Sequence, residues 1–142
     1  MAPAESKRSI LLVTNDLGPH AGGIETFILG LINFLDGNKL VIYTSKEEGS
    51  DDFDKKLLKK HGVIVIRDKS KVLLPTRRVQ SKAISILKDF QCEVVWFGAA
   101  APLALMAKNL KRAGAKKTVA LTHGHEVWWA KLPIFKSLLR KI

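Results

Sequence analysis

The feature that most constrains the fold is a regular alternation of short apolar runs with longer amphipathic stretches. The runs are rich in β-branched side chains, which predicts strands that are buried on both faces. They cover residues 10–14, 40–44, 63–66, 94–97 and 118–122, and the amphipathic stretches predict helices over 24–35, 52–60, 76–90, 103–113 and 132–142. Strands that alternate with helices form right-handed crossovers, so the sequence predicts a Rossmann-like, doubly wound α/β domain with a parallel sheet of about five strands.

Local signals agree with these boundaries. Ser50 or Asp51 is a plausible N-cap for the second helix, because short polar side chains accept hydrogen bonds from the first turn. Gly62 and Gly114 stand where the second and fourth helices should end.

Length and composition indicate one globular domain with a basic surface. The 142 residues are 46% hydrophobic and 26% charged, which excludes a disordered chain, and the formal net charge is +11. The basic residues collect in two blocks, 54–88 and 108–142. These blocks are either solvated helix faces or a surface for polyanions such as nucleic acid or an anionic membrane leaflet.

Neither a membrane span nor a secretion signal is predicted. The longest stretch without charge, 94–107, is shorter than the roughly 20 residues of a spanning helix, and the apolar run 10–13 is too short for a signal peptide. Cys92 is the single cysteine and cannot form an intrachain disulfide, which fits a reducing compartment. We interpret it as structural and expect a cytoplasmic chain.

Ligands in open α/β sheets bind beyond the carboxyl ends of strands, which draws attention to the loops after the first, third and fifth strands. In the first loop Gly22 and Gly23 directly precede a helix, where backbone N–H groups and the helix dipole favour a phosphate. The spacing matches neither a dinucleotide fingerprint nor a Walker A loop. The glycines could equally serve only a tight turn, and Glu25 could serve only the first helical turn.

The segment after the fifth strand, 122–126, carries His123, His125 and Glu126 around a glycine. Three polar groups at the carboxyl end of a strand suggest a reaction centre. A metal site is awkward, because His123 and His125 would point the same way along the strand while Glu126 would point opposite. We therefore expect no metal.

Two further segments carry charge or amphipathic character. Arg77 and Arg78 begin the third predicted helix, a geometry that suits a phosphate but is equally common on solvated surfaces. Residues 131–142 follow Trp128 and Trp129 and mix cations with apolar side chains. This segment is either an interfacial amphipathic helix or a helix that packs on a domain outside the sequence.

Taken together, several motifs resemble the acceptor-side, N-terminal domain of retaining GT-B glycosyltransferases, and most closely the actinobacterial phosphatidylinositol mannoside mannosyltransferases. The motifs are Thr14-Asn-Asp16, Gly22-Gly-Ile-Glu25, Leu74-Pro-Thr76, the run Trp96–Ala107, Thr122-His-Gly-His-Glu-Val127 and Leu139-Arg-Lys-Ile142. The resemblance covers nearly the whole chain but only the first of the family's two Rossmann-like domains. It implies transfer of mannose from GDP-mannose to a phosphatidylinositol mannoside with retention, no catalytic metal or cofactor, and no activity without the C-terminal donor-binding domain.

The resemblance also implies residue roles. Gly22 and Gly23 would face the donor diphosphate, with His125 and Glu126 as supporting donor-side residues, and His123 would contact the transferred sugar near the reacting centre. Asp16 would contact the acceptor's polyol head group. Arg77 and Arg78 depart from the family pattern after Leu-Pro-Thr, and we assign them to the acceptor phosphate on their charge alone.

The expected partners are a sugar nucleotide, an anionic phospholipid acceptor and the inner face of the plasma membrane. The missing C-terminal domain is a further partner, supplied in trans if another chain carries it. A non-catalytic module that binds anionic lipid head groups is the alternative. Nucleic acid is not expected, because no recognition motif is present and the aromatic residues are not interleaved with the cations.

Overall fold

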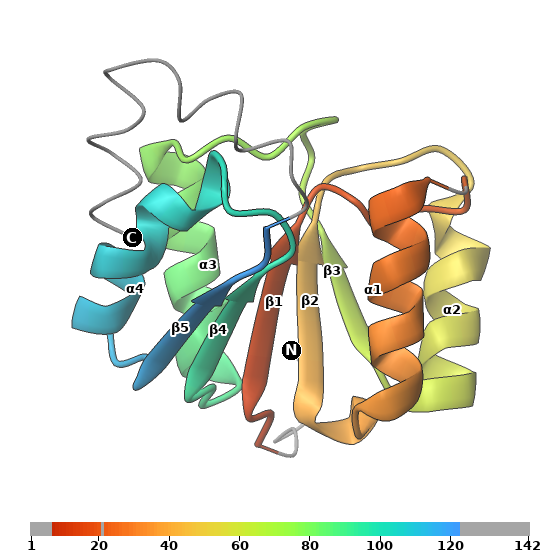
Figure 1. Cartoon of the computed structure of the whole chain (residues 1–142), viewed down its shortest axis with the longest axis horizontal. Coiled ribbons are helices and arrows are strands. Elements are labelled where there is room, and N and C mark those ends of the chain that lie inside the picture. The colour runs from red at the N-terminus through yellow and green to blue at the C-terminus, as the bar shows by residue number, and fades with distance from the viewer. Residues whose placement is uncertain (1–6, 21, 123–142) are drawn as a thin grey trace.

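A five-stranded parallel sheet forms the centre of the molecule (Figure 1), as the alternating pattern predicts. We describe a computed structural model, which describes residues 7–20 and 22–122. The strands lie in the order β3-β2-β1-β4-β5. Their bounds are β1 Ile10–Thr14, β2 Leu40–Thr44, β3 Ile64–Arg67, β4 Val94–Phe97 and β5 Lys117–Ala120. The prediction that the strands are buried on both faces is confirmed for β1 and β2 but wrong for the others: β3 and β5 are the edges of the described sheet, and β4 alternates between buried and partly exposed residues.

The first three helices begin and end within one or two residues of the predicted boundaries, whereas the fourth begins four residues later than predicted, because residues 103–106 form a 3₁₀ turn. The helices are α1 Gly23–Phe34, α2 Ser50–His61, α3 Arg77–Asp89 and α4 Ala107–Arg112, with short 3₁₀ turns at η1 Gly37–Lys39 and η2 Leu103–Met106. The predicted N-cap of α2 is wrong: Gly49, in the left-handed region at φ 73°, precedes the helix, and Ser50 is its first residue. Gly62 ends α2 in the left-handed region, as predicted, because glycine has no Cβ penalty there. The predicted helix 132–142 lies outside the described residues.

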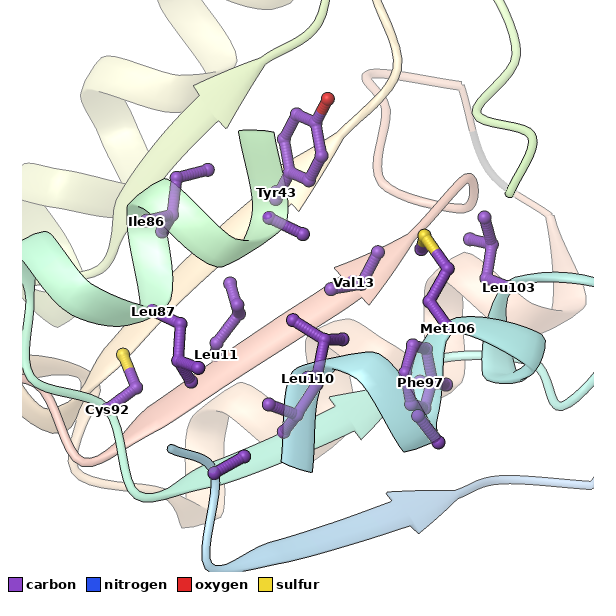
Figure 2. Close-up of a cluster of buried hydrophobic side chains, with 14 of the residues drawn as sticks. Leu11, Val13, Tyr43, Ile86, Leu87, Cys92, Phe97, Leu103, Met106 and Leu110 are labelled. Atoms are coloured by element: carbon purple, nitrogen blue, oxygen red, sulfur yellow. The ribbon is translucent and has the colours of Figure 1, made fainter. Parts of the chain in front are cut away.

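The two faces of the sheet carry separate cores. Alternate residues of a strand point to opposite faces, so Leu11 and Val13 face α3 and α4 while Leu12 faces α1 and α2. The first core contains large side chains such as Phe97 and Leu110 (Figure 2). This arrangement confirms the doubly wound α/β prediction.

The strand order reverses between β1 and β4, because the chain builds outward from β1 to β3 and then returns to the other side of β1. Ligand crevices in such sheets form at this point. The loops that meet there follow the first and fourth strands, whereas the sequence had drawn attention to those after the first, third and fifth. The fourth was missed because strand order is not visible in the sequence.

The amino edge of the sheet is held by structural contacts. The buried Arg8 guanidinium donates hydrogen bonds to the carbonyl oxygens of Gly62 at 2.7 Å and Gly37 at 2.9 Å. Cys92 is buried at this edge, and burial raises the pKa of its thiol to about 12. Its burial supports the interpretation of Cys92 as a structural residue.

Within the described residues, no helix is long and apolar enough to cross a bilayer.

Candidate functional site at the carboxyl edge of the sheet

The carboxyl ends of β1 and β4 approach each other closely at the strand-order reversal. The Gly98 N–H donates to the Val13 carbonyl at 2.9 Å, directly after β4. A Cβ at Gly98 would lie 2.4 Å from Thr14 Oγ1 and 2.7 Å from Thr14 Cβ. Glycine is therefore required here by packing, and it brings the β4 loop against the end of β1.

Asp16 lies half-buried at this edge, two residues beyond the end of β1. Its backbone N–H donates to Thr14 Oγ1 at 3.0 Å, which turns the chain sharply out of the sheet. The structure thus places Asp16 at the carboxyl end of β1, beside the strand-order reversal where ligands of this fold bind.

The two glycines of the first loop open α1. Gly22 is the N-cap, in extended conformation at φ −121°, and no side chain caps the helix. A Cβ on Gly23 would meet nothing within 4 Å. The backbone at position 23 has no positive φ, and a side chain there would have room. A tight turn therefore does not require glycine at this position. Glu25 lies in the first turn, and its Oε2 would be 2.8 Å from a Cβ on Gly22.

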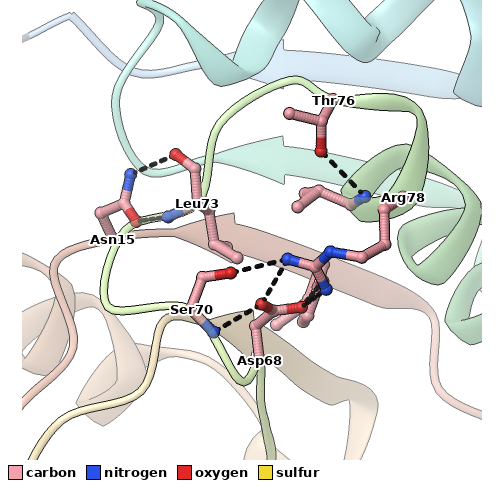
Figure 3. A network of polar contacts seen from close by, with 8 residues as sticks. Asn15, Asp68, Ser70, Leu73, Thr76 and Arg78 are labelled. Atoms are coloured by element: carbon pink, nitrogen blue, oxygen red, sulfur yellow. Dashed lines mark hydrogen bonds and ion pairs between the residues drawn. The ribbon is translucent and has the colours of Figure 1, made fainter.

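Arg78 and Arg77, both at the start of α3, have different surroundings. The Arg78 guanidinium forms a two-point ion pair with Asp68, at 2.8 Å for each contact, and donates to Ser70 Oγ at 2.6 Å (Figure 3). Arg77 is exposed as the first residue of α3, after the N-cap Thr76. Of the two arginines, Arg78 is already engaged by a buried carboxylate.

Asp68 is the centre of a polar network that sequence reasoning missed. Its carboxylate also accepts hydrogen bonds from the buried Tyr43 hydroxyl at 2.5 Å and from the Ser70 N–H at 2.8 Å. The hydrogen bonds from Arg78 hold the pKa of Asp68 well below its usual range, while burial, with the Asp68 carboxylate adding to it, raises the pKa of Tyr43. An acid directly after a strand was the only signal for this network in the sequence.

Asn15, which follows β1, holds the middle of the loop between β3 and α3 in place. Its side-chain amide donates to the Leu73 carbonyl at 3.0 Å and accepts from the Leu73 N–H at 2.6 Å (Figure 3). Leu73 is fully buried, whereas its neighbours Val72 and Leu74 are 57% and 51% exposed. The two-point contact therefore joins the residue beside Asp16 to a loop that presents apolar side chains to solvent.

A mixed-charge cavity of about 500 Å³ lies beside the ends of β2 and β3. Basic Lys46, Arg67 and Lys69 line it together with acidic Glu47 and Glu48. Arg67 is itself paired with Asp54 at 2.8 Å. The cavity offers no single-sign surface, so its charges alone do not select a ligand.

The candidates His123, His125 and Glu126 lie outside the described residues. Shortly before them in the chain, the described Leu121 is held against the end of β4 and its loop: its N–H donates to the Phe97 carbonyl at 3.0 Å, and its carbonyl accepts from the Ala100 N–H at 2.9 Å. Among the residues that the structure describes, there is no group of three or more side chains arranged to hold a metal ion.

A five-stranded parallel sheet of this order, with glycine-rich and polar loops at its carboxyl edge, defines a Rossmann-like α/β domain, an architecture consistent with one half of a GT-B fold. Known proteins support the same class. The chain is 40% identical over 134 residues to the GDP-mannose-dependent alpha-(1-6)-phosphatidylinositol monomannoside mannosyltransferase of Mycolicibacterium smegmatis, in a match covering 94% of this chain and 35% of that relative.

Two further relatives agree. The enzyme of the same description from Mycobacterium tuberculosis is 40% identical over 136 residues, covering 94% of this chain and 35% of the relative. The GDP-mannose-dependent monoacylated alpha-(1-6)-phosphatidylinositol monomannoside mannosyltransferase of Corynebacterium glutamicum is 42% identical over 139 residues, covering 96% and 35%. No family model matches the chain. These relatives confirm the resemblance, and the chain spans about a third of their length.

Proposed function

We propose that this chain is the acceptor-side half of a retaining mannosyltransferase that transfers mannose from GDP-mannose to a phosphatidylinositol mannoside. The observation that carries the proposal is the identity of at least 40% to such enzymes across at least 94% of the chain. Because the chain spans only 35% of those relatives, the proposed activity needs a second, donor-binding domain, whether continuous with this chain or supplied in trans. GDP-mannose is a substrate, and no metal or further cofactor is proposed.

The proposed donor site centres on the start of α1. Departure of GDP develops negative charge on the diphosphate, and the uncapped N-terminus of α1 at Gly22 and Gly23 supplies backbone N–H groups and a helix dipole to stabilise it. Room around Gly23 for a ligand supports this role. The Glu25 carboxylate lies beside Gly22, so it would have to move away or lie next to the diphosphate when the donor binds.

In the proposed reaction, the bond between the sugar's anomeric carbon and the diphosphate oxygen breaks as the acceptor hydroxyl oxygen bonds to that carbon from the same face. The leaving diphosphate takes the hydroxyl proton. His123 would contact the mannose near the reacting carbon, with His125 and Glu126 in supporting positions. The hydrogen bonds that hold Leu121 against the end of β4 and its loop, just before this segment in the chain, support this placement.

The proposed acceptor site uses Asp16 for the polyol head group and Arg77 for the phosphate. Arg78 remains a candidate for the phosphate, but its ion pair with Asp68 favours a positioning role, in which it holds the 68–78 loop in place. Asp16 adjoins Asn15, which is hydrogen-bonded to Leu73 in the loop that leads to Arg77, and this contact supports a shared ligand.

A membrane contact at the inner face of the plasma membrane is proposed for the loop between β3 and α3. Exposed Val72 and Leu74 lie among the cations Lys69, Lys71 and Arg77. Apolar side chains flanked by cations favour an anionic lipid surface, where each cation close to the surface contributes about 1 kcal/mol. This surface lies at the same edge as the proposed acceptor site.

The decisive experiment replaces the corresponding third of the Mycolicibacterium smegmatis relative with this chain and measures mannose transfer from radiolabelled GDP-mannose. We expect the chimera to be active and His123→Ala to lower kcat at least about a hundredfold, as loss of a group at the reacting centre does. A folded chimera without activity, or near-normal turnover in the His123→Ala chimera, would overturn the assignment.

The exposed loop also favours a second candidate, a non-catalytic module that binds anionic lipid head groups. Vesicle sedimentation separates the two proposals when it is read together with the chimera. Salt-sensitive binding to anionic vesicles with an inactive chimera supports the module, whereas the absence of such binding removes both the module and the membrane contact.

A further inference from the structure

A cavity of about 250 Å³ lies between α1 and α2, the two neighbouring helices on one face of the sheet (Figure 1). It is lined by Leu29, Ile32 and Asn33 of α1 and by Phe53, Lys56, Leu57, Lys60 and His61 of α2. On each helix these positions recur every three or four residues, so they form two facing stripes. The cavity is therefore an elongated groove between two helices, which we call the α1–α2 groove.

The floor of the α1–α2 groove is apolar. Ile32 and Leu57 belong to the core on this face, and Leu29 and Phe53 pack against it while remaining partly accessible. Water in such a groove contacts little but hydrocarbon, so its replacement by an apolar chain is favourable by roughly 25 cal/mol for each Å² removed from water.

The rim of the α1–α2 groove is cationic. Lys56 and Lys60 stand one helical turn apart on α2, both exposed, and His61 adjoins them. The acids of α2 lie toward its other end: Asp52 is 4.0 Å from Lys55, and Asp54 is paired with Arg67. No ion pair within the described part of the chain involves Lys56 or Lys60.

We propose that the α1–α2 groove binds a single-chain anionic amphiphile in free solution, such as a fatty acid. The apolar chain would lie on Leu29, Ile32 and Phe53, and the anionic head would contact Lys56 and Lys60. The volume is slightly below the roughly 300–1,000 Å³ of sites for drug-sized ligands, which fits one chain better than a two-chain lipid or a helix. The site lies near the carboxyl end of α2, away from the carboxyl edge of the sheet, and does not depend on the proposed transferase activity.

The test is a titration of the full ¹⁵N-labelled chain with decanoate below its micelle concentration, followed by backbone amide NMR. We expect saturable shifts at the residues that line the groove. Lys56→Gln/Lys60→Gln should weaken binding about three- to thirtyfold, the equivalent of two partly exposed ion pairs. Decanol has no carboxylate to contact the lysines. It should therefore bind the wild-type chain about as weakly as decanoate binds the Lys56→Gln/Lys60→Gln variant.

Lys55→Gln/Lys59→Gln is the matched control, because it removes the same charge from the same helix at positions that do not line the groove. Equal weakening in the control shows non-specific attraction and overturns the proposal, as does equally tight binding of decyltrimethylammonium. Absence of saturable shifts also overturns it. Concentration-dependent shifts of the same amides without decanoate would assign the groove to a second copy of the chain, and binding only to vesicles would assign it to a membrane.

Discussion

At the scale of single residues, the buried hydrogen bond between Tyr43 and Asp68 depends on the protonation state of both side chains. The Tyr43 hydroxyl donates to a carboxylate whose charge Arg78 stabilises. The phenol must remain neutral to donate, and the acid must remain ionised to accept. The pKa of Tyr43 is accordingly raised, and that of Asp68 is lowered.

These shifts predict opposite pH dependences. The raised pKa of Tyr43 gives a contribution to stability that is complete below the unfolded value of about 10 and is lost as pH rises above it. The lowered pKa of Asp68 gives a contribution that is present above about pH 4 and is lost as pH falls. Tyr43 is the only tyrosine, so phenolate absorbance reports its ionisation alone. We expect that absorbance to appear only as circular dichroism shows unfolding, and phenolate formation in the folded chain near pH 10 would contradict the network.

Gly98 provides a second prediction at this scale. Gly98→Ala places a methyl group 2.4 Å from Thr14 Oγ1, and we expect a loss of about 1–3 kcal/mol in the free energy of unfolding. The measurement is urea denaturation. Gly30→Ala is the control, because a Cβ there meets nothing within 4 Å and alanine favours the helix interior by about 0.5–1 kcal/mol. Equal stability of Gly98→Ala and wild type would show that the β1–β4 contact is loose.

At the scale of elements, the start of α1 can be tested separately from the fold. Gly23→Ala has room for its Cβ, so we expect the free energy of unfolding to change by less than about 0.5 kcal/mol. In the active chimera the same methyl group would obstruct the diphosphate, and we expect the KM for GDP-mannose to rise at least about tenfold. An unchanged KM would remove Gly23 from the donor site.

The β3–α3 loop is the second element with a testable role. Val72→Ser/Leu74→Ser removes two half-exposed apolar side chains without disturbing buried Leu73, so stability should be nearly unchanged. We expect binding to anionic vesicles, measured by sedimentation, to fall about tenfold. Leu58→Ser is the control, since Leu58 is similarly exposed, at 52%, but lies on α2 and not on this loop. A comparable loss in the control would mean that the loop has no special part in membrane contact.

At the scale of the whole molecule, folding and activity are expected to separate. Two cores on one continuous sheet predict a single cooperative unfolding transition for this chain. A donor that contacts only the start of α1 would bind weakly. We expect calorimetry to give a GDP-mannose affinity at least about tenfold lower than that of the chimera with a donor-binding domain. Equal affinities would contradict a donor site shared between two domains.

The sequence by itself determined the secondary structure, because strand and helix periodicities are local properties that neighbouring residues display directly. The runs at 10–14, 40–44 and 94–97 match their strands residue for residue. Sequence motifs also located the glycines at the start of α1 and the acid after β1. The relatives then confirmed the resemblance that those motifs suggested.

Only the tertiary structure decided which distant groups meet. Strand order placed the β4 loop, with Gly98, against Thr14, and nothing in the sequence between them indicates that contact. Arg78 is one of two adjacent arginines in the sequence, yet folding pairs it with Asp68 and leaves Arg77 exposed. Pairings of this kind depend on loop paths and burial across the whole domain, and local pattern carries no information about them.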